Sequence, residues 1–119
     1  ATLPGGGRLM RASAERVRLQ DAAAATGNGV ALNVAGAARL GVQLSGTFVA
    51  TVFFEITIDG ANWIPIAMTP AGGGAGVTNT AAPNILSAAM SGFALFRARI
   101  SAFTSGTVTV DALVTEAAA

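Results

Sequence analysis

The side chains that could do chemistry in this chain are mainly carboxylates and guanidinium groups. The 119 residues include no His, Cys or Tyr, and all seven basic residues are Arg. Nucleophilic catalysis needs a base beside the nucleophile, and the many Ser and Thr residues have no His, Lys or Cys to serve in that role. The residue types therefore argue against a hydrolase that works through a covalent intermediate.

The acidic residues do not form the pattern of a glycosidase pair or of a calcium site. Glu55 and Asp59 could be considered as a glycosidase pair, but four residues along a strand separate them by about 13 Å, too far for either mechanism. Asp21, Asp59 and Asp111 are scattered singly, without the spacing of a calcium loop. We therefore predict no catalytic residue and no metal site.

Glycine-rich segments are a weak indication of phosphate binding here. Gly27-Asn28-Gly29 and the triple-glycine runs at 5–7 and 72–74 are not followed by Lys-Ser or Lys-Thr, nor by a convincing helix. Such runs are typical of turns and loops. The sequence thus predicts no cofactor.

The basic residues are concentrated near the N-terminus. Residues 1–18 contain four Arg and one acidic residue, whereas residues 19–119 contain three Arg and five acidic residues. A nucleic-acid-binding domain would carry a basic patch with interleaved aromatic residues across its folded face. The pattern instead predicts a docking arm for an acidic protein surface, and no nucleic-acid partner.

The chain has few charged residues to keep its surface apart from other proteins. Charged residues make up 11%, against about 25% in an average soluble domain. One interpretation is that abundant Ala inflates the mean hydropathy of +0.59. The other is that part of the surface is buried in an assembly. No apolar stretch reaches the length of a membrane span and no signal peptide is visible, so we expect synthesis in the host cytoplasm, no secretion and no membrane partner.

The pattern of apolar residues predicts the elements. Residues 1–14, with Pro4 and three consecutive glycines, are expected to form an extended flexible arm. Residues 15–119 are expected to form one domain of seven or eight short strands separated by Gly, Pro and Asn turns. This spacing predicts an all-β fold, an antiparallel β-sandwich or jelly-roll-like barrel.

The clearest predicted strand, residues 47–58, carries Glu55 on the face opposite its apolar residues. Arg97 and Arg99, two residues apart, share the outer face of the strand at 93–102. One interpretation is that Glu55 pairs with one of these Arg residues across strands. The alternative is that the Arg face, with Leu95 and Phe53, contacts a neighbouring subunit, as Arg is favoured at interfaces.

Several segments resemble the pattern of small virion proteins of tailed bacteriophages. They are residues 42–48 (VQLSGTF), 51–55 (TVFFE), 58–63 (IDGANW) and 96–110 (FRARISAFTSGTVTV). The resemblance implies a nonenzymatic structural protein, best matching a capsid decoration (cement) protein on the outer capsid surface. Its implied partners are the major capsid protein and other copies of itself, as a homotrimer or a dimer.

Two alternatives stay open: a tail or neck component of the virion, and a carbohydrate-binding or adhesion module. The second is weakened by the lack of Tyr and by a single Trp, Trp63, which is more typical of a core or hairpin anchor. The candidate partner-binding residues lie in the arm, on the segment that follows it and on the Arg face: Arg8, Met10, Arg11, Arg16, Arg18, Phe53, Leu95, Arg97 and Arg99.

Overall fold

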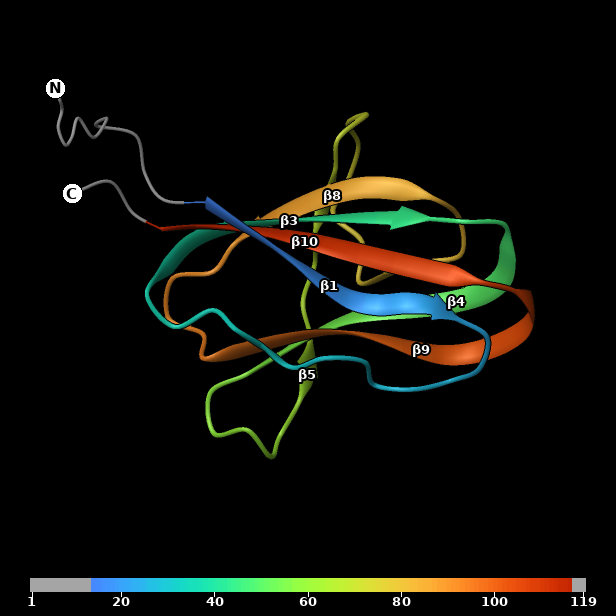
Figure 1. The fold of residues 1–119 in the computed structure, drawn as a ribbon. Coiled ribbons are helices and arrows are strands. Elements are labelled where there is room, and N and C mark those ends of the chain that lie inside the picture. The colour runs from blue at the N-terminus through green and yellow to red at the C-terminus, as the bar shows by residue number, and fades with distance from the viewer. Residues whose placement is uncertain (1–13, 117–119) are drawn as a thin grey trace, which may run out of the picture.

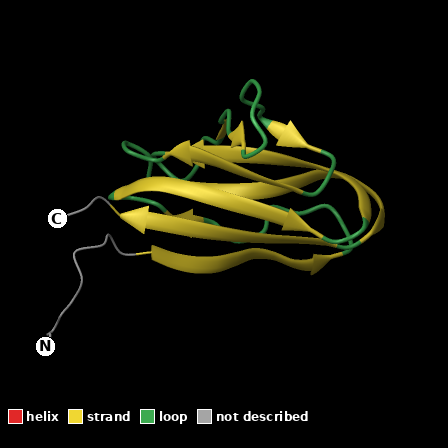
Figure 2. Ribbon diagram, turned by 90° about the horizontal axis from the view of Figure 1, so that it is seen from above, coloured by secondary structure: helices red, strands yellow, loops and turns green. Residues whose placement is uncertain are grey.

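In the computed structural model, which describes residues 14–116, two antiparallel sheets of five strands each pack face to face (Figure 1). Sheet A has the strand order β1-β10-β3-β8-β6. Sheet B has the order β2-β9-β4-β5, with β7 also paired to β4. The described part of the chain contains strands and loops but no helix (Figure 2). The predicted all-β antiparallel sandwich is therefore confirmed.

The strands are more numerous and less even in length than predicted. Those within residues 14–116 are β1 (Ala14–Ala23), β2 (Leu32–Asn33), β3 (Ala37–Ser45), β4 (Phe48–Thr57), β5 (Ile64–Pro65), β6 (Thr69–Pro70), β7 (Asn79–Thr80), β8 (Asn84–Ala89), β9 (Leu95–Gly106) and β10 (Val108–Glu116). The expected number was seven or eight. Four of the ten strands have two residues each, because short loop segments also pair with a sheet edge. β9, with 12 residues, continues past the end of the strand expected at 93–102.

The core lies between the sheets and is built by alternation. Side chains of a strand point to opposite faces in turn, so every second residue of a long strand faces the other sheet. Each of the four central strands contributes three such buried residues: Leu40, Val42 and Leu44 from β3, Ala50, Val52 and Phe54 from β4, Phe96, Ala98 and Ile100 from β9, and Val108, Val110 and Ala112 from β10. Apolar burial of this kind is the main stabilising contribution to the fold.

Two Ser-Gly-Thr segments form neighbouring corners at one end of the sandwich. Ser45-Gly46-Thr47 joins β3 of sheet A to β4 of sheet B, and Ser105-Gly106-Thr107 joins β9 of sheet B to β10 of sheet A. The Thr107 amide donates to the Thr47 carbonyl at 3.1 Å. Both glycines have positive φ, 109° and 89°. Two segments of identical sequence thus form two corners that pack against each other.

A bulge in β1 closes one side of the sandwich. Arg18 pairs with Asp111 of β10, and Gln20 pairs with the adjacent residue, Val110. Leu19 is therefore an extra residue in β1 that has no partner of its own in β10. This places the side chains of Leu19 and Gln20 inside, where the exposed fraction of Gln20 is 7%. The Gln20 amide nitrogen donates to the carbonyl oxygens of Ala98 at 2.9 Å and Gly27 at 3.3 Å. Gln20 therefore connects the edge of sheet A to sheet B.

We expect the change Gln20→Leu to lower the free energy of unfolding by about 1–3 kcal/mol, because it leaves a buried carbonyl without its donor. Urea unfolding is the measurement. Gln43→Leu is the matched control, since Gln43 is exposed on β3 and makes no comparable contact within residues 14–116. Equal losses in the two variants would contradict a connecting role for Gln20.

The structure describes only part of the predicted division into an arm, residues 1–14, and a β domain, residues 15–119. Residues 1–13 lie outside the described residues. Ala14, expected to be the last residue of the arm, is the first residue of β1 and pairs with Thr115 of β10. The rest of β1, up to Ala23, lies within the segment expected to form the β domain.

Candidate functional site

The outer face of sheet B collects four of the predicted partner-binding residues. In the register of β4 and β9, Phe53 lies opposite Arg99, Glu55 opposite Arg97, and Thr57 opposite Leu95. Alternation puts all of these side chains on the side facing away from the core. The structure thus brings Phe53, Leu95, Arg97 and Arg99 onto one surface, as their spacing predicts.

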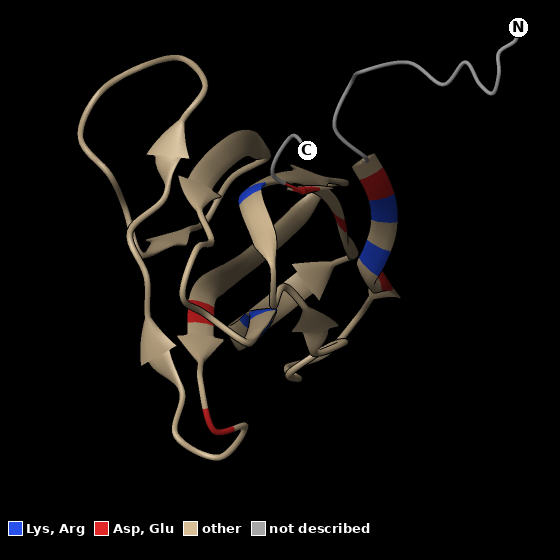
Figure 3. Cartoon of the chain, turned by 90° about the vertical axis from the view of Figure 1, so that its left-hand side faces the viewer, with Lys and Arg blue, Asp and Glu red and all other residues tan. Residues whose placement is uncertain are grey.

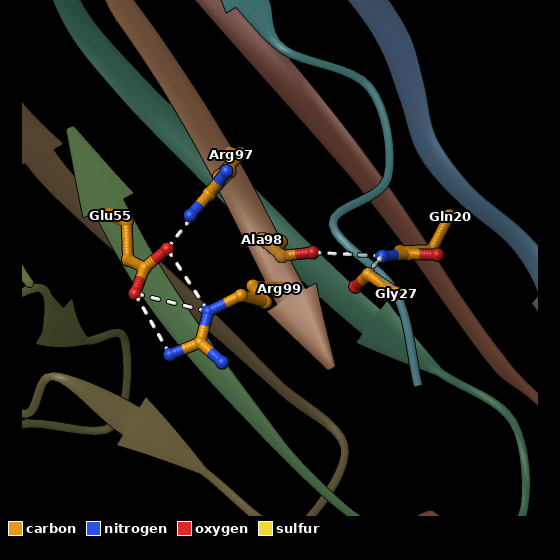
Figure 4. Close-up of polar contacts among 6 residues, drawn as sticks. All are labelled: Gln20, Gly27, Glu55, Arg97, Ala98 and Arg99. Atoms are coloured by element: carbon orange, nitrogen blue, oxygen red, sulfur yellow. Dashed lines mark hydrogen bonds and ion pairs between the residues drawn. The ribbon is translucent and has the colours of Figure 1, made fainter. Parts of the chain in front are cut away.

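Glu55 lies between the two guanidinium groups of this face and binds both (Figure 4). Arg97 Nε donates to Glu55 Oε1 at 2.8 Å. Arg99 Nε lies 3.1 Å from each carboxylate oxygen, and its Nη2 donates to Oε2 at 3.0 Å. Such charge-assisted, fork-like contacts are stronger than neutral hydrogen bonds. The cross-strand pairing expected for Glu55 with one Arg therefore involves two. We name Glu55, Arg97 and Arg99 the Arg–Glu cluster.

Aromatic rings complete the surroundings of the cluster. The Arg97 guanidinium carbon lies 4.2 Å from the ring centre of Trp63, and that of Arg99 lies 5.5 Å from the ring centre of Phe53. Both distances are within the range of cation–π attraction. Trp63 directly precedes β5, the short strand that pairs with β4 beside Glu55. The hairpin that carries Trp63 projects from the body of the sandwich (Figure 1).

Burial of Glu55 was not expected, because its strand position suggested an exposed outer face. Its exposed fraction is 5%, and that of Thr57 is 2%. Ile58, the last residue of the strand predicted at 47–58, is 73% exposed. Glu55 is covered because the hairpin after β4 returns alongside that strand, where Trp63 packs on Arg97 of the same face. Ile58 is exposed because β4 ends at Thr57, so Ile58 lies in the turn that follows.

The pKa of Glu55 reflects two opposed effects. Burial raises the pKa of the carboxyl, but hydrogen bonds from Arg99 and Arg97 outweigh it, and the resulting pKa lies below the ordinary value. Glu55 is therefore ionised at neutral pH and is unsuited to act as a general acid. Its carboxylate holds the two Arg side chains in place.

The other member of the considered acid pair, Asp59, organises the turn after β4. Its Oδ1 accepts hydrogen bonds from the backbone amides of Ala61 and Asn62, both at 2.8 Å, and from the Thr57 hydroxyl at 3.0 Å. Its Oδ2 accepts one from the Asn62 side chain at 2.7 Å. The backbone amides of Asn62 and Ala61, followed by these side chains, hold the pKa of Asp59 far below its usual range. Asp59 thus has a structural role in the Asx-type turn.

Stability is expected to fall in acid in part through Asp59. A carboxyl whose pKa is lower in the folded state stabilises the fold at pH above its unfolded pKa of about 3.9, and this contribution is lost as the pH falls further toward the folded value. The variant Asp59→Asn should therefore show a shallower loss of unfolding free energy between pH 5 and pH 2 than the wild type. Urea unfolding across this range is the measurement. Identical slopes would exclude Asp59 as a contributor, while Glu55 and Asp111, whose pKa values are also lowered, keep some slope in both proteins.

Arg16 and Arg18 lie on the other layer of the sandwich. Both belong to β1 at the edge of sheet A, and charged residues are sparse along the rest of the described chain (Figure 3). Arg18 binds Asp111 through Nε at 2.9 Å and Asp21 through Nη1 at 3.3 Å. Arg16 lines a shallow depression on the outer face of sheet A with Asp111, Leu113, Gly41 and Ile85. The structure therefore does not bring these two Arg together with the Arg–Glu cluster.

Three further predicted residues, Arg8, Met10 and Arg11, lie outside the described residues. Trp63, expected to be a core or hairpin anchor, is half-buried and belongs to the site. The sequence feature that could have placed Trp63 in the site is its position just after the Asp59–Asn62 turn, because this turn returns the chain beside the strand that carries Glu55. What the sequence did not show is that Arg97 of β9 reaches across β4 to the Trp63 ring.

The described residues contain neither a group of metal-binding side chains nor a helix that could span a membrane. Within residues 14–116, no three His, Cys, Asp or Glu side chains are grouped so that they could hold a metal ion. In the same range, no helix has the length and apolar character needed to cross a membrane.

Known proteins share this fold. The structure of the "SPBc2 prophage-derived protein YomS" matches with a TM-score of 0.84 and 15% identity, over 93% of this chain and 100% of that one. The structure of the "PBSX exported protein XepA" matches with a TM-score of 0.86 and 22% identity, over 97% of this chain. This chain spans only 42% of the length of that XepA structure.

The search of curated protein sequences finds no match. A family model described as XepA, in contrast, matches residues 13–114, which include nearly all of the two sheets described above. This chain therefore belongs to the XepA family.

Proposed function

We propose that this protein is a phage structural protein that decorates the outside of the capsid and links neighbouring coat subunits without catalysing a reaction. Membership of the XepA family and a fold shared with a prophage-derived protein support a phage origin. The proposed partners are the major capsid protein and further copies of the chain, with a homotrimer favoured over a dimer.

The observation that carries the proposal is the exposure of large apolar side chains on the outer faces of both sheets. Leu113 of β10 and Ile85 of β8, on sheet A, are 47% and 51% exposed, and Val49 of β4, on sheet B, is 59% exposed. Contact with a partner would remove this apolar surface from water, which is favourable. A module with such a surface on each side is suited to bridging two neighbours.

The charges of the described residues fit the same role. Glu55 pairs with Arg97 and Arg99, and Arg18 pairs with Asp111 and Asp21. Pairing within the module lowers the cost of removing these groups from water when a partner covers them. Glu55 and Asp59, both occupied by structural contacts, have no free role in acid–base chemistry.

The first test is the copy number of this protein in purified phage particles, measured by quantitative mass spectrometry against the major capsid protein. A number comparable to that of the capsid protein is expected. A few copies for each particle would reassign the protein to the tail or neck. Absence from particles would overturn the virion proposal and leave the carbohydrate-binding alternative to be tested by glycan titration.

An exported module is a second candidate function, favoured by the description of XepA as an exported protein. It predicts that the protein leaves the producing cell before lysis, free of particles. Fractionating an induced culture into cells, cell-free medium and sedimented particles, followed by immunoblotting, distinguishes the two functions. Recovery in the medium before any particle is released supports export, whereas recovery with the particles supports decoration.

The proposal assigns part of the attachment to the segment that carries Arg8, Met10 and Arg11. Removing residues 1–13 is expected to leave the thermal unfolding midpoint unchanged and to weaken retention on particles. The cut is placed before Ala14 because this residue pairs within β1. The measurement is co-sedimentation of the protein with particles at increasing temperature. Undiminished retention of the shortened protein would exclude a role for this segment in attachment.

A further inference from the structure

The Arg–Glu cluster contains more donors than its one carboxylate uses. Glu55 occupies Arg97 through Nε alone, and occupies Nε and Nη2 of Arg99. Within residues 14–116, no side chain or carbonyl accepts a hydrogen bond from either Nη atom of Arg97 or from Nη1 of Arg99. With two guanidinium groups and one carboxylate, the cluster keeps one unbalanced positive charge.

Arg97 is held in a fixed position although its terminal donors have no partner within residues 14–116. Its side chain is only 17% exposed, lies against Trp63 and is anchored through Nε by Glu55. A guanidinium held in this way loses little conformational entropy when it binds a further group. Its partly desolvated surroundings also strengthen attraction to an anion, because the local dielectric is lower than that of water.

We propose that this face binds an acidic side chain of a protein partner, whose carboxylate pairs with the free Nη donors of Arg97 and is supported by Arg99. The inference deepens the proposed function and rests on it, because it assumes that the partner is a protein. Arg and Trp side chains in partly desolvated positions are the residues that most often dominate binding at protein interfaces.

The surrounding charges favour a protein over a nucleic acid. Residues 14–116 contain five Arg and six acidic residues, so the described module has no positive field that would attract a polyanion. The rim of the cluster is apolar, with Leu95 and Phe53 on the same face. A single carboxylate surrounded by apolar contacts fits this arrangement better than a row of phosphates.

Trp63 provides a direct readout of binding, because it is the only Trp in the sequence and its ring contacts Arg97. The 119-residue protein is titrated with a short glutamate-rich peptide, and Trp63 emission is followed. A saturable change is expected. The same peptide with Gln in place of Glu should give none, and added salt should weaken the response, as for any charge pair.

Variants test which Arg is responsible. Arg97→Gln is expected to weaken peptide binding by about tenfold or more, the usual effect of losing a hydrogen bond between charged groups. Arg97→Lys retains the charge but loses the planar fork, and is expected to weaken binding less than Arg97→Gln. It also serves if Arg97→Gln does not fold. Arg39→Gln is the control, because Arg39 belongs to β3 in the other sheet and binds Ser87 there.

The outcomes separate this inference from the proposed function. No emission change with the glutamate peptide, or an equal change in the Arg97 variants, would overturn the carboxylate site even if the protein is abundant on particles. Stronger binding of single-stranded DNA than of the peptide would reassign the face to nucleic acid. Peptide binding that depends on Arg97, with no protein on particles, would retain the site and refute the decoration role.

Discussion

Replacing Gly106 with alanine is expected to lower the free energy of unfolding by about 4 kcal/mol, close to the limit that a single domain tolerates. Gly106 has a φ of 89°, which an L-residue adopts only with strain. An added Cβ would also collide with the Thr47 carbonyl oxygen and lie 2.7 Å from the Phe48 Cα. These are backbone atoms of the neighbouring corner, so they cannot move aside without disturbing the crossing from β3 to β4.

Gly92→Ala is the matched control for this prediction. Gly92 has a similar φ of 96°, but a Cβ there would meet nothing within 4 Å. This variant should lose only about 1–2 kcal/mol from backbone strain. Urea unfolding of the two variants separates the cost of the conformation from the cost of the collision. Equal losses would mean that the packed corners do not limit stability.

The second large effect is expected at the Arg–Glu cluster. Glu55→Gln should lower the free energy of unfolding by about 3 kcal/mol, because it leaves two partly buried guanidinium groups without a counter-charge. The amide is nearly the same size as the carboxylate, so the loss reports charge and hydrogen bonding rather than a cavity. Thermal or urea unfolding at neutral pH measures it.

Asp111→Asn is the control for Glu55→Gln, since it removes the acidic partner of an Arg18 side chain that is 50% exposed. Exposed pairs contribute little, because water screens the charges. A much smaller loss is therefore expected than for Glu55→Gln. If both variants lose the same amount, burial does not explain the stability of the cluster. Added salt should reduce the contribution of Asp111 to the free energy of unfolding by a larger fraction than that of Glu55, because the Arg18–Asp111 pair is more exposed.

Alternation of apolar residues was sufficient to predict the layers of this protein. Leu40, Val42 and Leu44, like Phe96, Ala98 and Ile100, recur at every second position and are buried. An apolar residue at every second position is typical of a strand that buries one face against the core. Several such segments therefore indicate an all-β fold. The same rule placed Phe53, Arg97 and Arg99 on one outer face.

The short strands were harder to predict. β5 and β7 lie within segments 63–68 and 77–80, where short strands are expected, but only two residues of each segment form a strand, whereas β6 lies in a Pro- and Gly-rich segment expected to be a loop. They form because a longer strand presents an edge with free hydrogen-bonding groups. Their pairing depends on where β4 and β8 lie in space.

The sequence by itself determined the all-β class, the burial of alternate apolar residues and the lack of His, Cys and Lys, because these follow from residue type and from separations of a few positions. Only the tertiary structure decided that Glu55 is buried between two Arg, that Trp63 lies against Arg97, and that Arg16 and Arg18 face away from that cluster. These contacts join residues 34 to 44 positions apart or on different sheets. They depend on strand register and on where a hairpin folds back, which local patterns do not encode.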